Sequence, residues 1–168
     1  MNNNLIITIG REYGTGGREI GQKLALRLGI PFYDRELITR AAKKTGFDEK
    51  LFEQLDKRAT NSFLYSLTMF GSVGLNGMSL TDQLYLAQSN VIREMAEESS
   101  CVIVGRCADH VLRDFPNKFD FFIHGSIEDR VKRVQTCGDY VIEGKTPEAA
   151  LEKMDKQRST YYNYYTGK

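Results

Sequence analysis

Short apolar runs alternate along this chain with stretches of helical period. Residues 5–9 form a nearly continuous run rich in β-branched side chains that ends in glycine, which is typical of a strand buried on both faces of a sheet. From about Arg18 the apolar residues recur at i, i+4 and i+8, which predicts a helix that ends at Gly29. Residues 30–33 predict a second strand, so the chain begins with a βαβ unit.

The same alternation continues to the end of the chain. The pattern next predicts helices over residues 34–44 and 47–58 and an irregular stretch over 60–77. A helix capped by Ser79 and Asp82 follows over about 80–95. Strands are then predicted over 101–104 and 119–124, and helices from 126 onward with a break near 138–146. The strand over 101–104 and the one over 119–124 are both expected to be buried. Strands that alternate with helices predict an open parallel sheet with helices on both faces.

Polar or glycine residues follow every predicted strand. The pairs are Gly10-Arg11, Asp34-Arg35, Gly105-Arg106 and His124-Gly125. Ligands of open parallel sheets bind at the carboxyl ends of the strands. We therefore expect the functional site at this edge of the sheet.

The composition narrows the class of protein. The chain has 168 residues with 23 Lys and Arg against 22 Asp and Glu, so a general basic binder of nucleic acid is excluded. No apolar run approaches the roughly 20 residues of a membrane span, and residues 1–4 do not resemble a signal peptide. Three cysteines at positions 101, 107 and 137 lack metal-ligand spacing, which predicts reduced thiols in a cytoplasmic protein without a metal site built on them.

Charge is unevenly distributed along the chain. Residues 1–46 carry 8 basic and 4 acidic side chains, whereas residues 47–100 carry 4 basic and 8 acidic ones. The positive excess surrounds the segment of residues 10–17, here called the glycine loop, and indicates an anionic ligand.

The glycine loop contains four glycines in eight residues, at positions 10, 14, 16 and 17. Such a loop between a strand and a helix can present backbone N–H groups and a helix N-terminus to a phosphate. It also fits a tight turn that lets the helix pack closely on the sheet. Neither the dinucleotide pattern G-x-G-x-x-G nor the Walker pattern is met, because Gly17 and Arg18 stand where the Walker lysine and Ser/Thr would be.

The segment ITIGREYGTGGREI at residues 7–20, followed by IPFYDRELI at residues 30–38, resembles the cytidylate kinase-like family, a divergent branch of the P-loop nucleoside monophosphate kinases. Further matches are Phe32-Tyr33-Asp34 with Arg40, residues 102–106, residues 119–133, and Asp155 with Arg158. The resemblance implies a single domain of three-layer α/β/α P-loop NTPase type. Its core would be residues 1–46 and 101–126, with an acceptor-binding insertion at about 47–100 and a lid at about 127–160. The family's fifth strand and closing helix have no counterpart here and are expected beyond Lys168.

The resemblance also implies a reaction and its residues. The activity would be ATP-dependent phosphoryl transfer to a nucleoside monophosphate, CMP or dCMP, with ATP and Mg²⁺ as cofactors and nucleotide substrates as partners. From the composition, no nucleic acid and no membrane are expected among the partners, and the oligomeric state stays open. Donor phosphates would be bound by Gly10, Gly14, Thr15, Gly16, Gly17 and Arg18. Arg18, Arg130, Arg133 and Arg158 would stabilise the transferring group. Asp34, Arg40, Arg106 and Asp155 would bind the acceptor.

The missing lysine leaves two interpretations open. Arg18 would supply the positive charge, with Thr15 or Glu19 touching the metal, or else the protein binds nucleotides without transferring a phosphoryl group. Arg130 and Arg133, at i and i+3, also fit a solvated helix face, and Asp34 also fits a helix cap.

Overall fold

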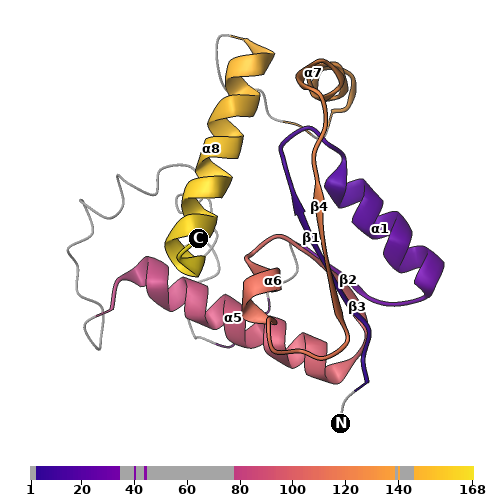
Figure 1. Cartoon of the computed structure of the whole chain (residues 1–168), viewed down its shortest axis with the longest axis vertical. Helices are drawn as coiled ribbons and strands as arrows, with labels where there is room; N and C mark the ends of the chain where they lie inside the picture. The colour runs from indigo at the N-terminus through magenta and orange to yellow at the C-terminus, as the bar shows by residue number, and fades with distance from the viewer. Residues whose placement is uncertain (1–2, 35–39, 41–43, 45–77, 139, 141–145) are drawn as a thin grey trace.

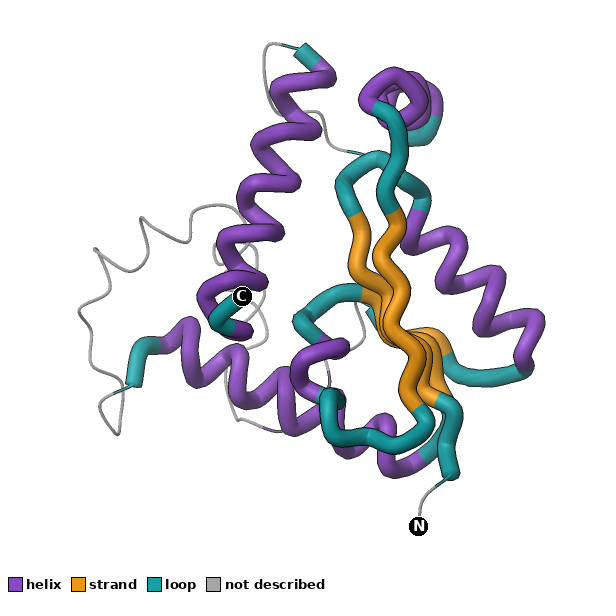
Figure 2. Tube along the Cα trace, in the orientation of Figure 1, coloured by secondary structure: helices purple, strands orange, loops and turns teal. Residues whose placement is uncertain are grey.

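The computed structural model describes residues 3–34, 40, 44, 78–138, 140 and 146–168, and its sheet is parallel throughout (Figures 1 and 2). The described residues form four strands in the order β2-β3-β1-β4. The strands are β1 (Ile6–Arg11), β2 (Phe32–Tyr33), β3 (Cys101–Val104) and β4 (Lys118–Ile123). Ile6 of β1 pairs with Cys101 on one side and with Lys118 on the other, so the carboxyl ends of the two central strands lie together.

Helices cover the two faces of this sheet. Helix α1 (Gly17–Leu28) lies on one face, and α5 (Leu80–Glu98) with the short α6 (Ala108–Val111) lies on the other (Figure 1). Helices α7 (Ile127–Thr136) and α8 (Pro147–Thr166) stand at the carboxyl end of the strands, and α8 runs back toward the start of α5. The predicted three-layer α/β/α architecture is confirmed.

Two apolar clusters form the core, one on each face. Alternate residues of the central strands point to opposite sides, so Ile6 and Ile103 pack with Ile92 of α5, whereas Ile9 and Val104 pack on the α1 side. Because both faces are covered, every residue of β3 is fully buried. This burial explains why the strand reads as a continuous apolar run in the sequence.

The predicted helix over about 80–95 is present and extends to Glu98. Its N-cap is Ser79, whose hydroxyl accepts a hydrogen bond from the backbone N–H of Asp82 at 3.1 Å, as the sequence predicts. Although α5 falls inside the predicted insertion at 47–100, it packs against the sheet as part of the core. The predicted helix at 47–58 and the irregular stretch at 60–77 lie outside the described residues.

The expectation that the fourth strand is buried is wrong. Phe119, Phe121 and Phe122 are each at least half exposed, because β4 is an edge strand of the described sheet and its neighbouring helices stand at its end rather than over its face. The same sequence pattern therefore predicts the strand but not its position in the sheet.

Helix α8 is anchored at its C-terminal end. The Tyr165 ring stacks on Tyr85 of α5, with ring centroids 3.9 Å apart, and the Tyr162 hydroxyl donates a hydrogen bond to Asp109 of α6 at 2.6 Å.

Among the described residues, every helix is too short or too polar to span a lipid bilayer.

Candidate phosphate-binding site

The glycine loop joins the end of β1 to the start of α1. Gly14 and Gly16 adopt positive φ angles of 79° and 76°, a conformation that favours glycine. Gly16 is the N-cap of α1 and leaves the first turn without a side-chain cap, so backbone N–H groups of that turn are available to an anion. The Thr15 hydroxyl donates to the carbonyl oxygen of Glu12 at 2.9 Å and so closes the loop on itself.

Helices α7 and α8 pack directly on this loop at Gly14. A Cβ atom at Gly14 would lie 3.0 Å from Leu151 Cδ2, 3.0 Å from Val134 Cγ1 and 3.1 Å from the carbonyl oxygen of Arg130. The loop and the predicted lid are therefore in contact, and only a residue without a side chain fits between them.

We expect Gly14→Ala to lower the free energy of unfolding by about 2 kcal/mol, since the residue pays for a left-handed conformation and also crowds α7 and α8. Gly29→Ala is the matched control, because Gly29 has a positive φ of 65° but no atom within 4 Å of the added Cβ. Urea denaturation of both variants measures the difference. Equal losses for the two variants would mean that the contact with α7 and α8 contributes nothing.

Arg130 ties the lid to the loop through a buried guanidinium. Its Nε donates to the carbonyl oxygen of Tyr13 at 2.8 Å, its Nη1 lies 3.2 Å from Glu12 Oε2, and its Nη2 pairs with Asp155. Asp155 also accepts a hydrogen bond from the backbone N–H of Tyr13 at 2.6 Å. Arg130 and Asp155 thus meet at the loop, and their polar contacts go to the Tyr13 backbone, to the Glu12 carboxylate and to each other.

Arg133, the next arginine along the same face of α7, covers the amino end of α1. Its Cζ would lie 2.6 Å from a Cβ on Gly16, so the guanidinium lies directly against the loop backbone. It pairs with Glu19, and its Nε lies 3.3 Å from the Tyr140 hydroxyl. The hydrogen bond with Tyr140 raises the pKa of Arg133, and Lys23 together with Arg133 lowers the pKa of Glu19.

A second group of arginines gathers at the ends of β1 and β3. We call it the arginine cluster. It consists of Arg11 and the three arginines that interact with it electrostatically, Arg18, Arg106 and Arg158. Arg158 of α8 donates to the carbonyl oxygen of Arg11 at 3.1 Å, and its guanidinium lies 5.1 Å from the centre of the Tyr13 ring. Burial lowers the pKa of Arg158. Arg18 is paired with Asp34 at 2.8 Å.

The backbone that follows β3 is left-handed for three residues. Gly105, Arg106 and Cys107 have φ angles of 79°, 61° and 53°. Two non-glycine residues in this region cost on the order of 1 kcal/mol or more each, and such strain concentrates at functional sites. The turn brings Arg106 into the range of Arg11.

The structure therefore brings most predicted site residues together, with one exception among those described. The residues that lie at the loop or in the arginine cluster are Gly10, Gly14, Thr15, Gly16, Gly17, Arg18, Asp34, Arg106, Arg130, Arg133, Asp155 and Arg158. Arg40 instead lies 3.7 Å from Glu98 of α5, with its guanidinium 5.7 Å from the Tyr33 ring centre.

The sequence assigned no individual role to Arg11, Glu12 or Tyr13, although all three contribute bonds or charge to the site. The available signal was the position of Arg11, directly after a buried strand that ends in Gly10. The same position made Arg106 a candidate at the end of β3.

The carboxylates around the loop are already paired with cations. Glu12 faces Arg130, Asp34 faces Arg18, and Glu19 faces both Lys23 and Arg133. Within the described part of the chain, no three His, Cys, Asp or Glu side chains form a group that could hold a metal ion. These residues do not make a protein-built Mg²⁺ cage.

Two of the cysteines lie in the core and are unsuited to act as nucleophiles. Cys101 and Cys107 are free thiols, and burial raises the pKa of each to about 12. A thiol with that pKa is almost wholly protonated at neutral pH.

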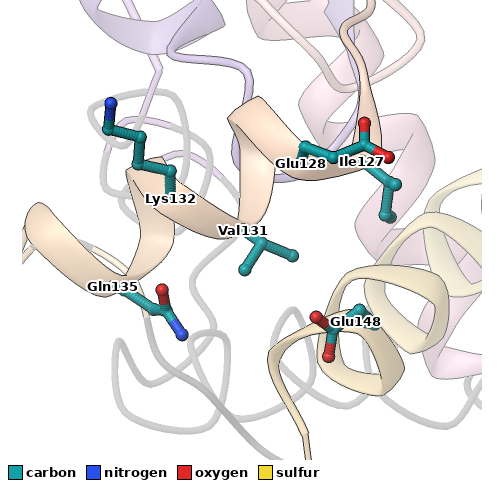
Figure 3. A pocket seen from close by; sticks show the side chains of 6 residues that line it. All are labelled: Ile127, Glu128, Val131, Lys132, Gln135 and Glu148. Carbon is teal, nitrogen blue, oxygen red and sulfur yellow. The ribbon is translucent and has the colours of Figure 1, made fainter.

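A separate hollow of about 420 Å³ lies between α7 and the start of α8 (Figure 3). In Figure 3, Val131 of α7 points toward the side on which Glu148 of α8 lies. The lining residues are Ile127, Glu128, Val131, Lys132, Gln135 and Glu148, none of which belongs to the glycine loop or the arginine cluster. The hollow is therefore separate from the candidate phosphate site at the loop.

The sequence also matches a known protein family. Residues 6–168 match the model of the cytidylate kinase-like family. The chain belongs to the cytidylate kinase-like family. A search of functionally curated proteins returns no match.

Solved structures similar to this cytidylate kinase-like chain include an uncharacterized protein from Eubacterium ventriosum, 31% identical, with a TM-score of 0.64 over 98% of this chain and 80% of that one. Shikimate kinase from Bacteroides thetaiotaomicron is 15% identical, with a TM-score of 0.54 over 95% of this chain and 82% of that one. Shikimate kinase from Acinetobacter baumannii, solved with shikimate, is 16% identical, with a TM-score of 0.50 over 97% and 80%. At these identities the two shikimate kinases show a shared P-loop kinase fold.

Proposed function

We propose that this chain is a cytoplasmic nucleoside monophosphate kinase that transfers the terminal phosphoryl group of ATP to CMP or dCMP. The observation that carries the proposal is the meeting of an uncapped glycine loop with arginines from β1, β3, α7 and α8 at one edge of a parallel sheet. Phosphoryl transfer requires two aligned phosphates and neutralisation of the charge on the moving group. Family membership supports a kinase, and the choice of a cytidine acceptor is our extension of it.

The proposed roles follow the position of each residue in the fold. The glycine loop binds the donor phosphates through backbone N–H groups, and Arg133 and Arg158 approach them from α7 and α8. Asp34 and Arg106 face the acceptor at the ends of β2 and β3. Arg40 joins the acceptor site once its exposed ion pair with Glu98 opens, which costs little because such pairs contribute about 1 kcal/mol or less.

Arg130 and Asp155 are proposed as positioning residues. Their bonds to Glu12, to Tyr13 and to each other support a role in holding the loop and the two lid helices together, because they leave little of the Arg130 guanidinium for a phosphate. Mg²⁺ would enter with the nucleotide, held by phosphate oxygens and water, since it commonly binds with few protein ligands.

One observation favours a second candidate function. Gly17 stands where a P-loop lysine would bridge the phosphates, and Arg18, proposed from the sequence to replace it, is half-exposed and paired with Asp34. A protein with such a loop could bind nucleotides and present the bound state to a partner without transferring a phosphoryl group. The charge totals, 23 basic against 22 acidic residues, give no reason to add nucleic acid to the partners of either function.

A coupled assay of ADP release against CMP, dCMP, UMP, AMP and GMP tests the two functions, together with calorimetric titration of ATP. Turnover with a cytidine nucleotide supports the kinase, and its absence despite ATP binding supports the binding module. Absence of both turnover and ATP binding would contradict both. The Arg158→Met variant, purified in the same way, controls for contaminating kinases.

A further inference from the structure

We propose that Arg11 supplies the positive charge for the donor phosphates that a lysine in the glycine loop would otherwise supply. The proposal rests on the proposed nucleotide-binding function and assigns one further residue to it. Arg11 is the last residue of β1 and was not among the candidates from the sequence.

Arg11 occupies the space that a side chain at position 17 would need. A Cβ atom on Gly17 would lie 2.8 Å from Arg11 Cβ and 3.1 Å from Arg11 Cγ. These atoms belong to the fixed stem of the arginine, not to its flexible end, so the two side chains cannot both be present without movement of the backbone. Glycine in the lysine position and arginine in position 11 are therefore one linked feature of this loop.

Gly105 makes room for the other end of the same side chain. A Cβ on Gly105 would overlap the Nη1 atom of Arg11, which means that the guanidinium lies against the bare backbone at the end of β3. Gly105 also has a positive φ of 79°, so the position is doubly restricted to glycine. The guanidinium thus lies at the carboxyl ends of the two central strands, where ligands of parallel sheets bind.

Among the residues that the structure describes, no carboxylate is paired with the Arg11 guanidinium. Within the described residues no hydrogen bond or ion pair engages it, and its nearest charges include three further cations, Arg158, Arg106 and Arg18. Asp34 attracts the Arg11 guanidinium, but this carboxylate is already paired with Arg18 at 2.8 Å. Burial, followed by repulsion from Arg158, lowers the pKa of Arg11 to about 10, so the side chain remains charged at neutral pH.

A partly buried, uncompensated cation is costly unless an anion pairs with it. The planar fork of a guanidinium matches the oxygens of a phosphate, and a polyphosphate chain presents several of them. Arg18 fits this role less well, because it is half-exposed and already bound to a carboxylate. The structure thus points to Arg11 rather than Arg18 as the replacement for the lysine.

Arg11→Gln tests the proposal, because glutamine keeps a polar stem and removes the charge. Calorimetric titration with ATP, CMP and inorganic tripolyphosphate is compared with that of wild type and of Arg113→Gln, an exposed arginine paired with Asp114 outside the site. We expect affinity for ATP and tripolyphosphate to fall about 10- to 100-fold, with CMP changed less than about 3-fold. Arg113→Gln should bind as wild type does.

Thermal melts separate a binding role from a structural one. Removal of an uncompensated cation should raise the melting temperature of the ligand-free variant by on the order of 2–4 °C, while the additional stabilisation by ATP shrinks. A lower melting temperature with unchanged ATP affinity would show a structural role and overturn the proposal. A larger loss for CMP than for ATP would overturn the donor assignment.

Binding measurements on the wild type distinguish failure of this proposal from failure of the proposed function. If wild type binds tripolyphosphate and Arg11→Gln does not, the charge assignment stands even where no kinase activity is found. If wild type binds neither ATP nor tripolyphosphate, both proposals fail.

Substitutions at positions 11 and 17 test directly whether the two side chains compete for the same space. Gly17→Lys alone should weaken ATP binding and lower the melting temperature, because the lysine meets the stem of Arg11. The double variant Arg11→Gly with Gly17→Lys should bind ATP more tightly than Arg11→Gly alone. Wild-type stability and affinity in Gly17→Lys alone would contradict the argument from space.

Discussion

Replacing Arg130 by methionine is expected to lower the free energy of unfolding by about 3–5 kcal/mol, the usual cost of removing one partner from a buried ion pair. The Arg130 side chain is only 8% exposed, and it holds two carboxylates, those of Glu12 and Asp155, against the loop. Methionine fills much of the same volume but removes the cation that both carboxylates contact. The carbonyl oxygen of Tyr13 also loses its donor.

Urea denaturation followed by circular dichroism measures this loss, with Arg113→Met as the control because Arg113 is exposed. The control should change stability by less than about 0.5 kcal/mol. Adding Asp155→Asn to Arg130→Met should restore part of the stability, since it removes one of the two like charges. A loss below about 1 kcal/mol for Arg130→Met would show that Arg130 behaves as a surface residue.

The burial of Arg130 marks the limit of what the helix pattern predicts. Arg130 and Arg133 occupy positions i and i+3 of α7, and the sequence offered only a choice between a solvated face and a ligand site for both. In the structure one is buried beneath the loop and the other covers it. Charge and spacing cannot separate these outcomes, because the difference comes from Asp155, a residue 25 positions away on another helix.

The core and the sheet were predictable for a physical reason. Strands buried on both faces need continuous apolar sequence, and β1 and β3 meet that need without ambiguity. β4 was predicted as a strand but not as an exposed edge, because order within a sheet depends on pairing between segments distant in sequence.

The candidate site was only partly predictable. The residue pattern pointed to the glycine loop and to Arg106, and the resemblance added Asp155 and Arg158. Arg11 was given no role of its own, since its significance depends on two glycines, 17 and 105, that leave space for it. A sequence motif does not reveal a contact between a side chain at the end of one strand and the glycine backbone at the end of the neighbouring strand.

The second large effect is expected on catalysis, from Arg158→Met. On the proposed reaction we expect kcat to fall about 1,000-fold, in the range found when an arginine that stabilises a transferring phosphoryl group is removed. Arg158 reaches the loop from α8, where it donates to the carbonyl oxygen of Arg11 and lies over the Tyr13 ring. Its guanidinium is thus held beside the glycine loop, where we propose that the donor phosphates bind, by contacts that do not consume all of its donors.

The stability of Arg158→Met should change by no more than about 1 kcal/mol, because the lost hydrogen bond and ring contact are offset by removal of a buried charge. Burial lowers the pKa of Arg158. At any pH below that pKa, the charged guanidinium is therefore less favourable in the folded protein than in the unfolded chain. This split between a large catalytic effect and a small stability effect is the opposite of the pattern expected for Arg130→Met.

Steady-state kinetics with ATP and the preferred acceptor, alongside denaturation, measure the split. Arg158→Lys serves as the graded variant, since it keeps the charge but loses the planar fork, and it should retain more activity than Arg158→Met while remaining well below wild type. A fall in kcat together with an unchanged KM for ATP would assign the arginine to the transferring group rather than to ground-state binding. If Arg158→Met loses activity only in proportion to its loss of folded protein, Arg158 is a packing residue, and the cations for the transferring group must then come from Arg133 and the remaining members of the arginine cluster.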